Sequence, residues 1–411
     1  MDLKVCLMSQ LFFPVSGGIE RYTYDLSRSL AKLGAEVHVI TLPCANRPRY
    51  EELEGVFVHR VPLGKSDYTA LMGTIMMART ANRLFKAEGT DIIHGNIPHM
   101  SDAFLSKSKI KANFVETIHT IVDSEFMPLK NASFRSLSTS EKFLSLAFPL
   151  VKRVERGILK RADGMISVSK SSKVATMRSY RMDEGRIKVI YIGISTERFR
   201  SNPVQSKLIR DRMGVDDGPL LLYVGRLCAR KRPELLIRAL SSLRAKVRGA
   251  KLMIVGGQNE DYQRYLTQLA SDLGVRDSVA FSGYVRDAEL PNYYSACDVF
   301  LLTSSAEGLG LSVLEAMACG KPVVAPNLDA IPEVVESGES GFLFNNFGEL
   351  VSSLASIVSD RSLKMKMGSY ARKHVIENFS CEKMAKETVD YYEAIMKGGG
   401  RRSPNNPDRL V

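Results

Sequence analysis

The sequence predicts an α/β protein made of two doubly wound, parallel-sheet domains. Three observations predict this class: the length, the alternation of short apolar runs with helical patterns, and a restart of that alternation in the second half. The chain has 411 residues, about twice the size of a common domain. Its composition, 45% hydrophobic and 25% charged, excludes collagen-like and disordered proteins.

A strand, a helix and a second strand open the chain. Lys4–Ser9 is a short apolar run, and Ile19–Leu33 carries apolar residues at helical spacing before Gly34. Glu36–Leu42 is the next apolar run. This order predicts parallel pairing through a right-handed crossover. Further buried strands in this half are predicted at Asp91–His94, Phe114–Thr117 and Gly164–Ser167.

The same alternation restarts after a break. Thr196–Pro219 is rich in proline, glycine and paired aspartates, which predicts a linker. The predicted strands that follow are Leu220–Val224, Lys251–Val255, Val279–Phe281, Val299–Leu302 and Pro322–Ala325. Helices are predicted at Pro233–Val247, from about Asp261, up to about Ala296 and from about Ser312. We therefore expect domains at 1–195 and 196–379, with the carboxyl ends of both sheets at one cleft, and a disordered tail at 398–411.

Charge is concentrated in the first half. The net charge is +12; residues 1–200 hold 30 Lys and Arg against 20 Asp and Glu, whereas residues 201–411 hold 27 against 25. Lys142–Lys188 alone holds 12 basic and 4 acidic residues. Such a cluster indicates an anionic partner, a membrane surface, nucleic acid or phosphorylated substrate, or else a solvated face.

Several features argue against other classes. No run reaches the roughly 20 apolar residues that span a bilayer, and the start of the chain does not resemble a signal peptide. The six cysteines form no CxxC pair, so neither a zinc site nor a disulfide framework is expected. These observations favour a cytoplasmic protein. No RNP-type or helix-turn-helix signature accompanies the basic cluster, which argues against nucleic acid as the partner.

Two glycine-containing loops follow predicted strands. The loop Pro14–Gly18 precedes the first helix, where Gly17 and Gly18 let backbone N–H groups approach an anion; a tight turn with positive φ is the alternative. The pattern is not the dinucleotide fingerprint GxGxxG. In the second domain, Arg226 and Lys231 follow a strand and could straddle a diphosphate, or could simply be solvated.

The segment Glu307–Glu315 is the most informative. It joins a strand to a helix, its glycines can present N–H groups to phosphate, and its two carboxylates are good acceptors for sugar or ribose hydroxyls. Ser312 and Glu315 also match a helix capping box, which would occupy the second carboxylate. Both interpretations of Glu315 stay open on spacing alone.

Further polar candidates lie in the first domain. His119 follows a strand and suits a polarising or hydrogen-bonding role, although a lone histidine is more often structural. His94 and Asn96 have a similar position. Ala147–Ala162 has the pattern of a basic amphipathic helix, either an interfacial membrane binder or an ordinary surface helix. The segment 125–147 before it is predicted to be a mobile loop that touches an acceptor or lipid.

Taken together, these motifs resemble family 4 of the retaining nucleotide-sugar glycosyltransferases, which have the GT-B fold. The resemblance covers about residues 3–396. The matching segments are Phe13-Pro14 with Gly17-Gly18-Ile19-Glu20, Gly225-Arg226-Leu227 with Lys231, Phe281 to Val285 with Leu290–Asp298, and Glu307–Glu315 with Ala316–Val323.

The resemblance implies roles for the candidate residues. Arg226 and Lys231 would hold the donor diphosphate, Glu307 the transferred sugar, and Glu315 the ribose. His119 would face the reacting sugar and the acceptor. The implied catalytic residues are His119, Arg226, Lys231 and Glu307. The implied donor-binding residues are Gly17, Gly18, Arg226, Lys231, Tyr284, Glu307, Gly308, Leu309, Gly310, Leu311 and Glu315. A helix at 380–397 would cross back onto the first domain.

The expected activity is transfer of a hexose from a UDP- or GDP-sugar to a lipid-linked or glycan acceptor at the cytoplasmic membrane face. The chain lacks an Asp-x-Asp motif, so no metal or other cofactor is expected, and the leaving phosphate would help to deprotonate the acceptor. The basic first domain favours peripheral contact with an anionic membrane and no nucleic acid. A soluble acceptor, an epimerase or phosphorylase, and a non-catalytic sugar-nucleotide scaffold are the alternatives.

The chain departs from the family pattern at three places. Tyr191–Ser195 replaces a Pro-Asn-Gly-Val-Asp turn, Asp329-Ala330 replaces Gly-Gly before Ile331-Pro332-Glu333, and Asn96 replaces the second histidine of a strand-end pair.

Overall fold

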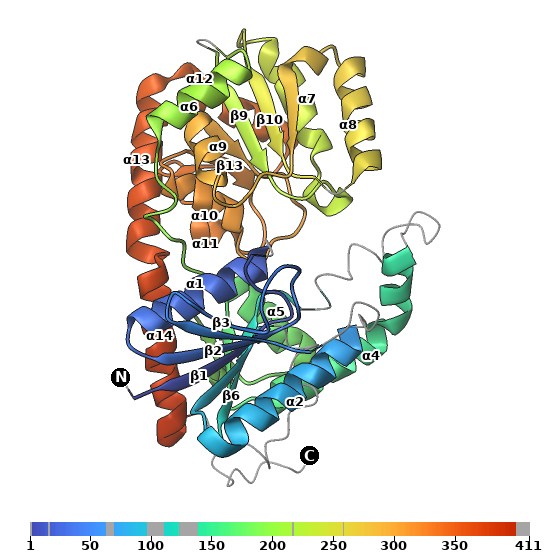
Figure 1. Cartoon of the computed structure of the whole chain (residues 1–411). Coiled ribbons are helices and arrows are strands. Elements are labelled where there is room, and N and C mark those ends of the chain that lie inside the picture. The colour runs from blue at the N-terminus through green and yellow to red at the C-terminus, as the bar shows by residue number, and fades with distance from the viewer. Residues whose placement is uncertain are drawn as a thin grey trace, which may run out of the picture. The chain divides into compact units, whose positions relative to one another are not determined.

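The structure is a computed structural model that describes residues 2–14, 17–62, 70–96, 111–121, 123, 139–215, 218–257 and 259–399. The chain forms two compact units (Figure 1). Unit 1 comprises Met1–Tyr191 and the chain from Glu382 onward, and unit 2 comprises Ile192–Cys381. Residues 125–138 of the predicted loop and 400–411 of the predicted tail lie outside the described residues. The loop prediction is wrong for 139–147, because the helix Thr139–Arg161 begins there, eight residues before the predicted start at Ala147.

Unit 1 is built on an eight-stranded sheet in the order β3-β4-β2-β1-β5-β6-β7-β8. All neighbours are parallel except the antiparallel pair β3 and β4. The strands are β1 (Lys4–Met8), β2 (Glu36–Thr41), β3 (Tyr50–Leu53), β4 (Val56–Arg60), β5 (Ile92–Gly95), β6 (Asn113–Ile118), β7 (Gly164–Ser167) and β8 (Ile187–Val189). The strand order reverses between β1 and β5, which is where ligands bind in such sheets.

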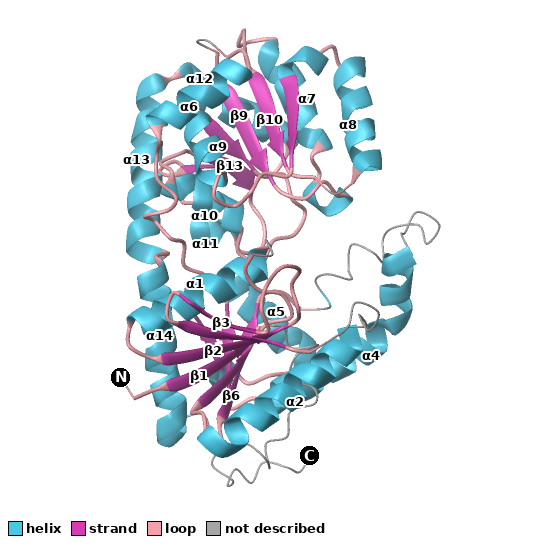
Figure 2. Cartoon of the chain, in the orientation of Figure 1, coloured by secondary structure: helices cyan, strands magenta, loops and turns pink. Residues whose placement is uncertain are grey.

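Helices cover both faces of this sheet, as a parallel sheet requires (Figure 2). They are α1 (Gly18–Lys32), α2 (Ala70–Glu88), α4 (Thr139–Arg161), α5 (Lys170–Tyr180) and α14 (Cys381–Ala394). Alternate residues of β1 serve opposite faces: Cys6 and Met8 pack in a cluster with Met77 and Phe85 of α2.

The helix α14 completes the packing of unit 1, as the resemblance implies. Tyr391 Oη accepts a hydrogen bond from the backbone N–H of Met165 at 3.1 Å, and Tyr392 Oη bonds His94 Nδ1 at 2.5 Å. Gly164 faces this helix, and a Cβ there would lie 2.4 Å from Cδ1 of Ile395. A glycine in β7 is therefore what lets α14 approach the sheet.

Unit 2 repeats the architecture with a six-stranded parallel sheet in the order β11-β10-β9-β12-β13-β14. Its strands are β9 (Leu220–Val224), β10 (Lys251–Val255), β11 (Val279–Gly283), β12 (Val299–Leu301), β13 (Val323–Pro326) and β14 (Gly341–Phe344). Its helices are α6 (Pro203–Arg212), α7 (Glu234–Arg244), α8 (Glu260–Asp272), α9 (Leu290–Ala296), α10 (Leu311–Ala318), α11 (Ile331–Val334), α12 (Phe347–Ser359) and α13 (Arg361–Asn378). Short 3₁₀ turns lie at Glu184–Arg186, Ala229–Lys231 and Arg276–Ser278, and a π turn at Ile395–Gly399.

The core of unit 2 also alternates across the sheet. Leu221 and Leu301 point to one face and pack with Leu240 of α7, whereas Phe300 points to the other and contacts the Tyr294 ring of α9 at 5.7 Å between centroids. The predicted class of two parallel α/β domains is confirmed.

The predicted linker Thr196–Pro219 is wrong for its middle part, because α6 lies there. Pro203 occupies the first turn of this helix, where its missing N–H costs nothing, and the Asn202 side chain accepts a hydrogen bond from Gln205 N at 3.2 Å. The helix packs on α9, and Ser206 Oγ donates to Ser295 O at 3.1 Å. Pro203 therefore marks the start of a helix and not a break between two domains.

Tyr191–Ser195, which departs from the family turn, keeps a glycine for a steric reason. A Cβ on Gly193 would lie 2.5 Å from the Ser380 carbonyl oxygen and 2.6 Å from Cα of Cys381. Ile194 N donates to Phe379 O at 2.7 Å. The two segments that leave unit 2 are therefore in backbone contact.

Candidate active site

The strand order of unit 2 reverses between β9 and β12. Ligands of open α/β sheets bind at the carboxyl ends of the strands beside such a reversal. The loop that follows β9 carries Arg226 and Lys231, and the loop that follows β12 carries Glu307. The topology thus places both predicted donor motifs beside this reversal.

Hydrogen bonds tie these two loops together. Arg230 Nη1 donates to the Ala306 carbonyl at 2.6 Å, and Ser305 N donates to the Arg230 carbonyl at 2.8 Å. Thr303 Oγ1 donates to the Lys231 carbonyl at 2.9 Å. Hydrogen bonds between the two loops therefore fix the backbone that carries the predicted catalytic residues.

Lys231 and Glu307 form an ion pair within this frame. Lys231 Nζ lies 2.5 Å from Glu307 Oε1, and the side chains are only 14% and 10% exposed. Partial burial strengthens such a pair because less water screens it. The structure brings these two predicted catalytic residues into direct contact.

Glu315 is held by a tyrosine. Tyr294 Oη donates to Glu315 Oε2 at 2.6 Å, and burial keeps the pKa of Tyr294 well above its usual value, so the hydroxyl stays a donor. The capping-box interpretation of Glu315 is wrong, because α10 is capped by Gly310 and Ser312 lies inside the helix.

The glycine loop before α10 has a backbone that a side chain would strain. Gly310 has φ +90, and a Cβ there would lie 2.8 Å from Cδ1 of Ile331. Leu309 is buried, so only its main chain can reach a ligand, whereas Gly308 and Leu311 are half-buried.

Arg226 and Tyr284 stand apart from this network. Arg226 is exposed at the end of β9, and Tyr284 follows β11 with 62% of its surface exposed. Within the described part of the chain neither side chain makes a hydrogen bond or ion pair. The structure therefore places both at the carboxyl edge of the sheet without bringing them to the Lys231–Glu307 pair.

In unit 1, Gly17 and Gly18 lie at the amino end of α1, beside the reversal between β1 and β5. Gly17 has φ −177, so the tight-turn interpretation with positive φ is wrong. Its lack of a side chain has a steric reason instead, because a Cβ would lie 2.1 Å from Glu20 Oε2. The neighbouring Val15 and Ser16 lie outside the described residues.

His119 follows β6 and packs edge-on against the Tyr22 ring, 4.7 Å between centroids. Its Nε2 is buried without a hydrogen-bond partner among the described residues. Burial lowers the pKa of His119 to about 3, which keeps the ring neutral at physiological pH. A neutral imidazole with an open nitrogen can bond a substrate hydroxyl.

His94 is structural, and Asn96 retains one free atom. His94 is fully buried, bonds Thr117 Oγ1 at 2.6 Å through Nε2, and bonds α14 through Nδ1. Asn96 Nδ2 donates to Thr23 Oγ1 at 2.8 Å, whereas its Oδ1 is buried and unpartnered within the described ranges.

The basic helix α4 matches the predicted amphipathic pattern of Ala147–Ala162 only in part. Ile158 and Leu159 are buried, together with Glu155, which accepts a hydrogen bond from Tyr180. Leu150, assigned to the apolar stripe, is 66% exposed. The exposed side of the helix carries, besides Leu150, the cations Arg153, Arg156, Lys160 and Arg161.

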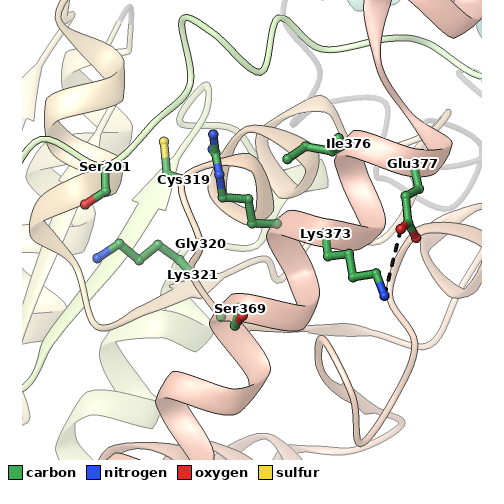
Figure 3. A pocket seen from close by; sticks show the side chains of 10 residues that line it. Ser201, Cys319, Gly320, Lys321, Ser369, Lys373, Ile376 and Glu377 are labelled. Atoms are coloured by element: carbon green, nitrogen blue, oxygen red, sulfur yellow. Dashed lines mark ion pairs between the residues drawn. The ribbon is translucent and has the colours of Figure 1, made fainter.

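Unit 2 also contains a cavity of about 500 Å³ beside α13, away from the donor residues (Figure 3). Lys321 Nζ donates to the Ser295 carbonyl at 2.7 Å, and Arg372 donates to the carbonyls of Ala318 and Phe199. Ser295 and Ala318 lie in the last turns of α9 and α10, so these cations complement helix carboxyl ends. We assign them a structural role.

No cluster of three or more His, Cys, Asp or Glu side chains in the described part of the chain could bind a metal ion. No helix within the described ranges combines the length and apolar character that crossing a bilayer requires.

Two family models match the chain. One described as Glycosyltransferase Family 4 matches residues 16–198, and one described as Glycosyl transferases group 1 matches residues 205–374. The chain belongs to glycosyltransferase family 4. It is 29% identical to an uncharacterised glycosyltransferase of Methanocaldococcus jannaschii, over 97% of this chain and 100% of that one. It is 28% identical to a D-inositol 3-phosphate glycosyltransferase of Stackebrandtia nassauensis, over 95% and 90%.

Solved glycosyltransferases share the fold. Sucrose-phosphate synthase from Thermosynechococcus elongatus superposes with a TM-score of 0.79 at 23% identity, over 96% of this chain and 100% of that one. The Anabaena protein HepE, solved with UDP and glucose, gives 0.75 at 22% identity, over 95% and 100%. The GT-B architecture of this chain follows from these structures, and its glycosyltransferase class follows from the family models.

Sequence reasoning assigned no role to three residues of the candidate site. Tyr294 lies 21 residues before its partner Glu315, within the matching segment Leu290–Asp298. Arg230 lies beside Lys231 and donates to the Ala306 carbonyl. Asp329, which departs from the family pattern, accepts a hydrogen bond from Glu307 N at 2.9 Å.

Proposed function

We propose that this family 4 glycosyltransferase moves a hexose from a UDP- or GDP-sugar to a lipid-linked or glycan acceptor, with retention at the anomeric carbon and without a metal. The observation that carries the proposal is the Lys231–Glu307 pair, held beside the strand reversal of unit 2. The UDP and glucose in the HepE structure agree with the donor part of this proposal. The inositol phosphate in a relative's name agrees instead with the alternative of a soluble acceptor.

The cations of unit 2 suit a diphosphate leaving group. Sugar transfer develops negative charge on the diphosphate as the glycosidic bond breaks. Fixed cations lower the free energy of that charge because they need no reorganisation during the reaction. Lys231 sits on a backbone tied by Arg230 and Thr303, and Arg226 offers an uncommitted guanidinium fork on the same loop.

The carboxylates suit the sugar and the ribose. Glu315 keeps its carboxylate oriented by Tyr294 and can accept hydrogen bonds from ribose hydroxyls. Glu307 can accept from hydroxyls of the transferred sugar once Lys231 turns to the diphosphate. The exposed ring of Tyr284 can stack on the base.

Unit 1 suits the acceptor. His119 Nε2 and Asn96 Oδ1 are buried polar atoms without partners among the described residues, which is costly unless a ligand supplies the bond. With retention, the leaving phosphate takes the proton of the acceptor hydroxyl on the same face of the sugar. A neutral His119 would orient that hydroxyl and not carry its proton away.

The experiment that tests the donor is a screen of UDP- and GDP-linked glucose, GlcNAc, galactose and mannose by nucleotide release and thermal shift in EDTA. One donor that stabilises the protein and releases its nucleotide despite EDTA supports the proposal. No binding at millimolar donor would favour the scaffold alternative, and release that needs added divalent cation would refute metal independence. The anomeric coupling of the product in NMR tests retention.

Membrane contact is proposed through the exposed side of α4. Leu150 and the cations Arg153 and Arg156 suit an anionic interface, where basic residues near the surface add about 1 kcal/mol each. The double variant Arg153→Glu with Arg156→Glu should lose binding to phosphatidylglycerol vesicles. Lys32→Glu with Arg178→Glu makes the same charge change on other exposed helix positions and should bind normally. Equal binding by both variants would overturn this surface.

A further inference from the structure

Asp329 lies between β13 and α11 with φ +49, in the left-handed backbone region. Glycine adopts this region without cost, and aspartate and asparagine adopt it more readily than other residues with a side chain. The chain therefore places a carboxylate in a backbone conformation that asparagine and glycine can also adopt.

One oxygen of this carboxylate has a defined partner. Asp329 Oδ2 accepts the backbone N–H of Glu307 at 2.9 Å, and Glu307 is the residue whose side chain bonds Lys231. Asp329 thus fixes the main chain of a predicted catalytic residue from a separate loop. The bond links the loops after β12 and β13.

The other oxygen is open. The Asp329 residue is exposed, and its side chain makes no further hydrogen bond or ion pair with the described residues. Asp329 therefore adds a second carboxylate beside the Lys231–Glu307 pair. An open carboxylate oxygen accepts hydroxyl hydrogen bonds and repels other carboxylates.

We propose that Asp329 is a specificity-determining residue that selects neutral, hydroxyl-bearing hexosyl donors and rejects hexuronosyl donors. The inference rests on the proposed function, because it takes the sugar to lie beside Glu307. One carboxylate oxygen holds the Glu307 main chain in place, and the other accepts a sugar hydroxyl. A sugar carboxylate at the same place would meet two acidic side chains.

The test compares kcat and KM for a nucleotide-linked glucose and the glucuronic acid analogue with the same base. Asp329→Asn keeps an acceptor oxygen and tolerates the left-handed backbone but removes the charge. Asp329→Gly keeps the backbone conformation and removes both the acceptor oxygen and the charge. We expect wild type to prefer the neutral donor by about a hundredfold, and both variants to narrow that preference about tenfold, mainly through KM of the acidic donor.

A purely structural role predicts a different pattern. If Asp329 only holds Glu307, Asp329→Gly lowers kcat for both donors equally and Asp329→Asn leaves the preference unchanged, and that result overturns the inference. Asp277→Asn, an exposed aspartate of the same unit, should keep the wild-type preference. If the wild-type protein turns over no nucleotide sugar, the proposed function and the inference are both overturned. If the wild-type protein turns over a donor and the Asp329 variants keep its preference between the neutral and the acidic donor, only the inference is overturned.

Discussion

The two units differ in how their candidate residues are held. In unit 2, Lys231, Glu307 and Glu315 already have protein partners, and backbone bonds join the loops that carry them. In unit 1, His119 and Asn96 keep buried polar atoms without partners among the described residues, while His94 serves the packing of α14.

The difference teaches which half is organised in advance. In the proposed function unit 2 binds the donor, whose diphosphate is nearly the same in every enzyme of this class, so a fixed set of charges suits it. Unit 1 is proposed to bind the acceptor, and acceptors differ, so a few open polar atoms suit it.

Lys231→Ala should reduce kcat/KM by roughly 10²–10³, because it removes one preorganised charge from the leaving group and strands Glu307. The measurement is nucleotide release from the preferred donor. Lys246→Ala, an exposed lysine of the same unit, should have wild-type activity. Near-normal turnover by Lys231→Ala would falsify the diphosphate assignment.

Tyr392→Phe should lower the free energy of unfolding by about 1–3 kcal/mol, because it leaves buried His94 Nδ1 without a partner. Chemical denaturation measures it. Tyr262→Phe removes the hydroxyl of a half-buried tyrosine that bonds Glu234 in unit 2, and should cost less. Equal losses would mean that the buried position of His94 adds nothing.

Stability should fall as the pH falls below 6.5. Burial lowers the pKa of His94 to about 3, so between these values the unfolded chain binds a proton that the folded chain does not. The free energy of unfolding then decreases by up to about 1.4 kcal/mol per pH unit for this group. Urea titrations at pH 7.0 and 5.5 measure the loss, which His94→Gln should reduce. An unchanged slope in that variant would show that His94 is protonated in the native state.

Glu307→Gln should tighten the binding of free UDP or GDP three- to tenfold, about 1 kcal/mol, while it abolishes most turnover. The reason is competition, since Glu307 pairs with the Lys231 ammonium that holds the diphosphate in the proposed function. Calorimetry with the nucleotide alone measures it. Weaker nucleotide binding would mean that the ion pair orients Lys231 and does not compete for it.

Sequence patterns predicted the positions of most buried strands. Gly164–Ser167, Leu220–Val224 and Lys251–Val255 were predicted with the bounds that the structure has, because fully buried parallel strands are continuous apolar runs. The edge strand Tyr50–Leu53 was missed, since Glu51 and Glu52 fill half of it and no apolar run marks it.

The candidate site was predictable where a residue type and a loop position coincide. Lys231 and Glu307 met that condition, although the assigned roles remain predictions. Their contact with each other was not predictable, because 76 residues separate them and only the strand order brings them together. At Asn202 and Pro203 the local pattern was sufficient but was not used. These residues have the pattern of a helix start, yet the composition around them led to the prediction of a linker.

The packing of α14 has a consequence for synthesis on the ribosome. Tyr391, Tyr392 and Ile395 complete the core of unit 1, yet they are translated after the whole of unit 2. At 5–20 residues per second, about 190 residues of unit 2 delay them by roughly 10–40 s. During that interval the nascent first half lacks the residues that contact His94 and Gly164 in the folded unit. An N-terminal fragment that ends near Tyr191 should therefore need a chaperone, or the missing helix supplied as a peptide, to stay in solution.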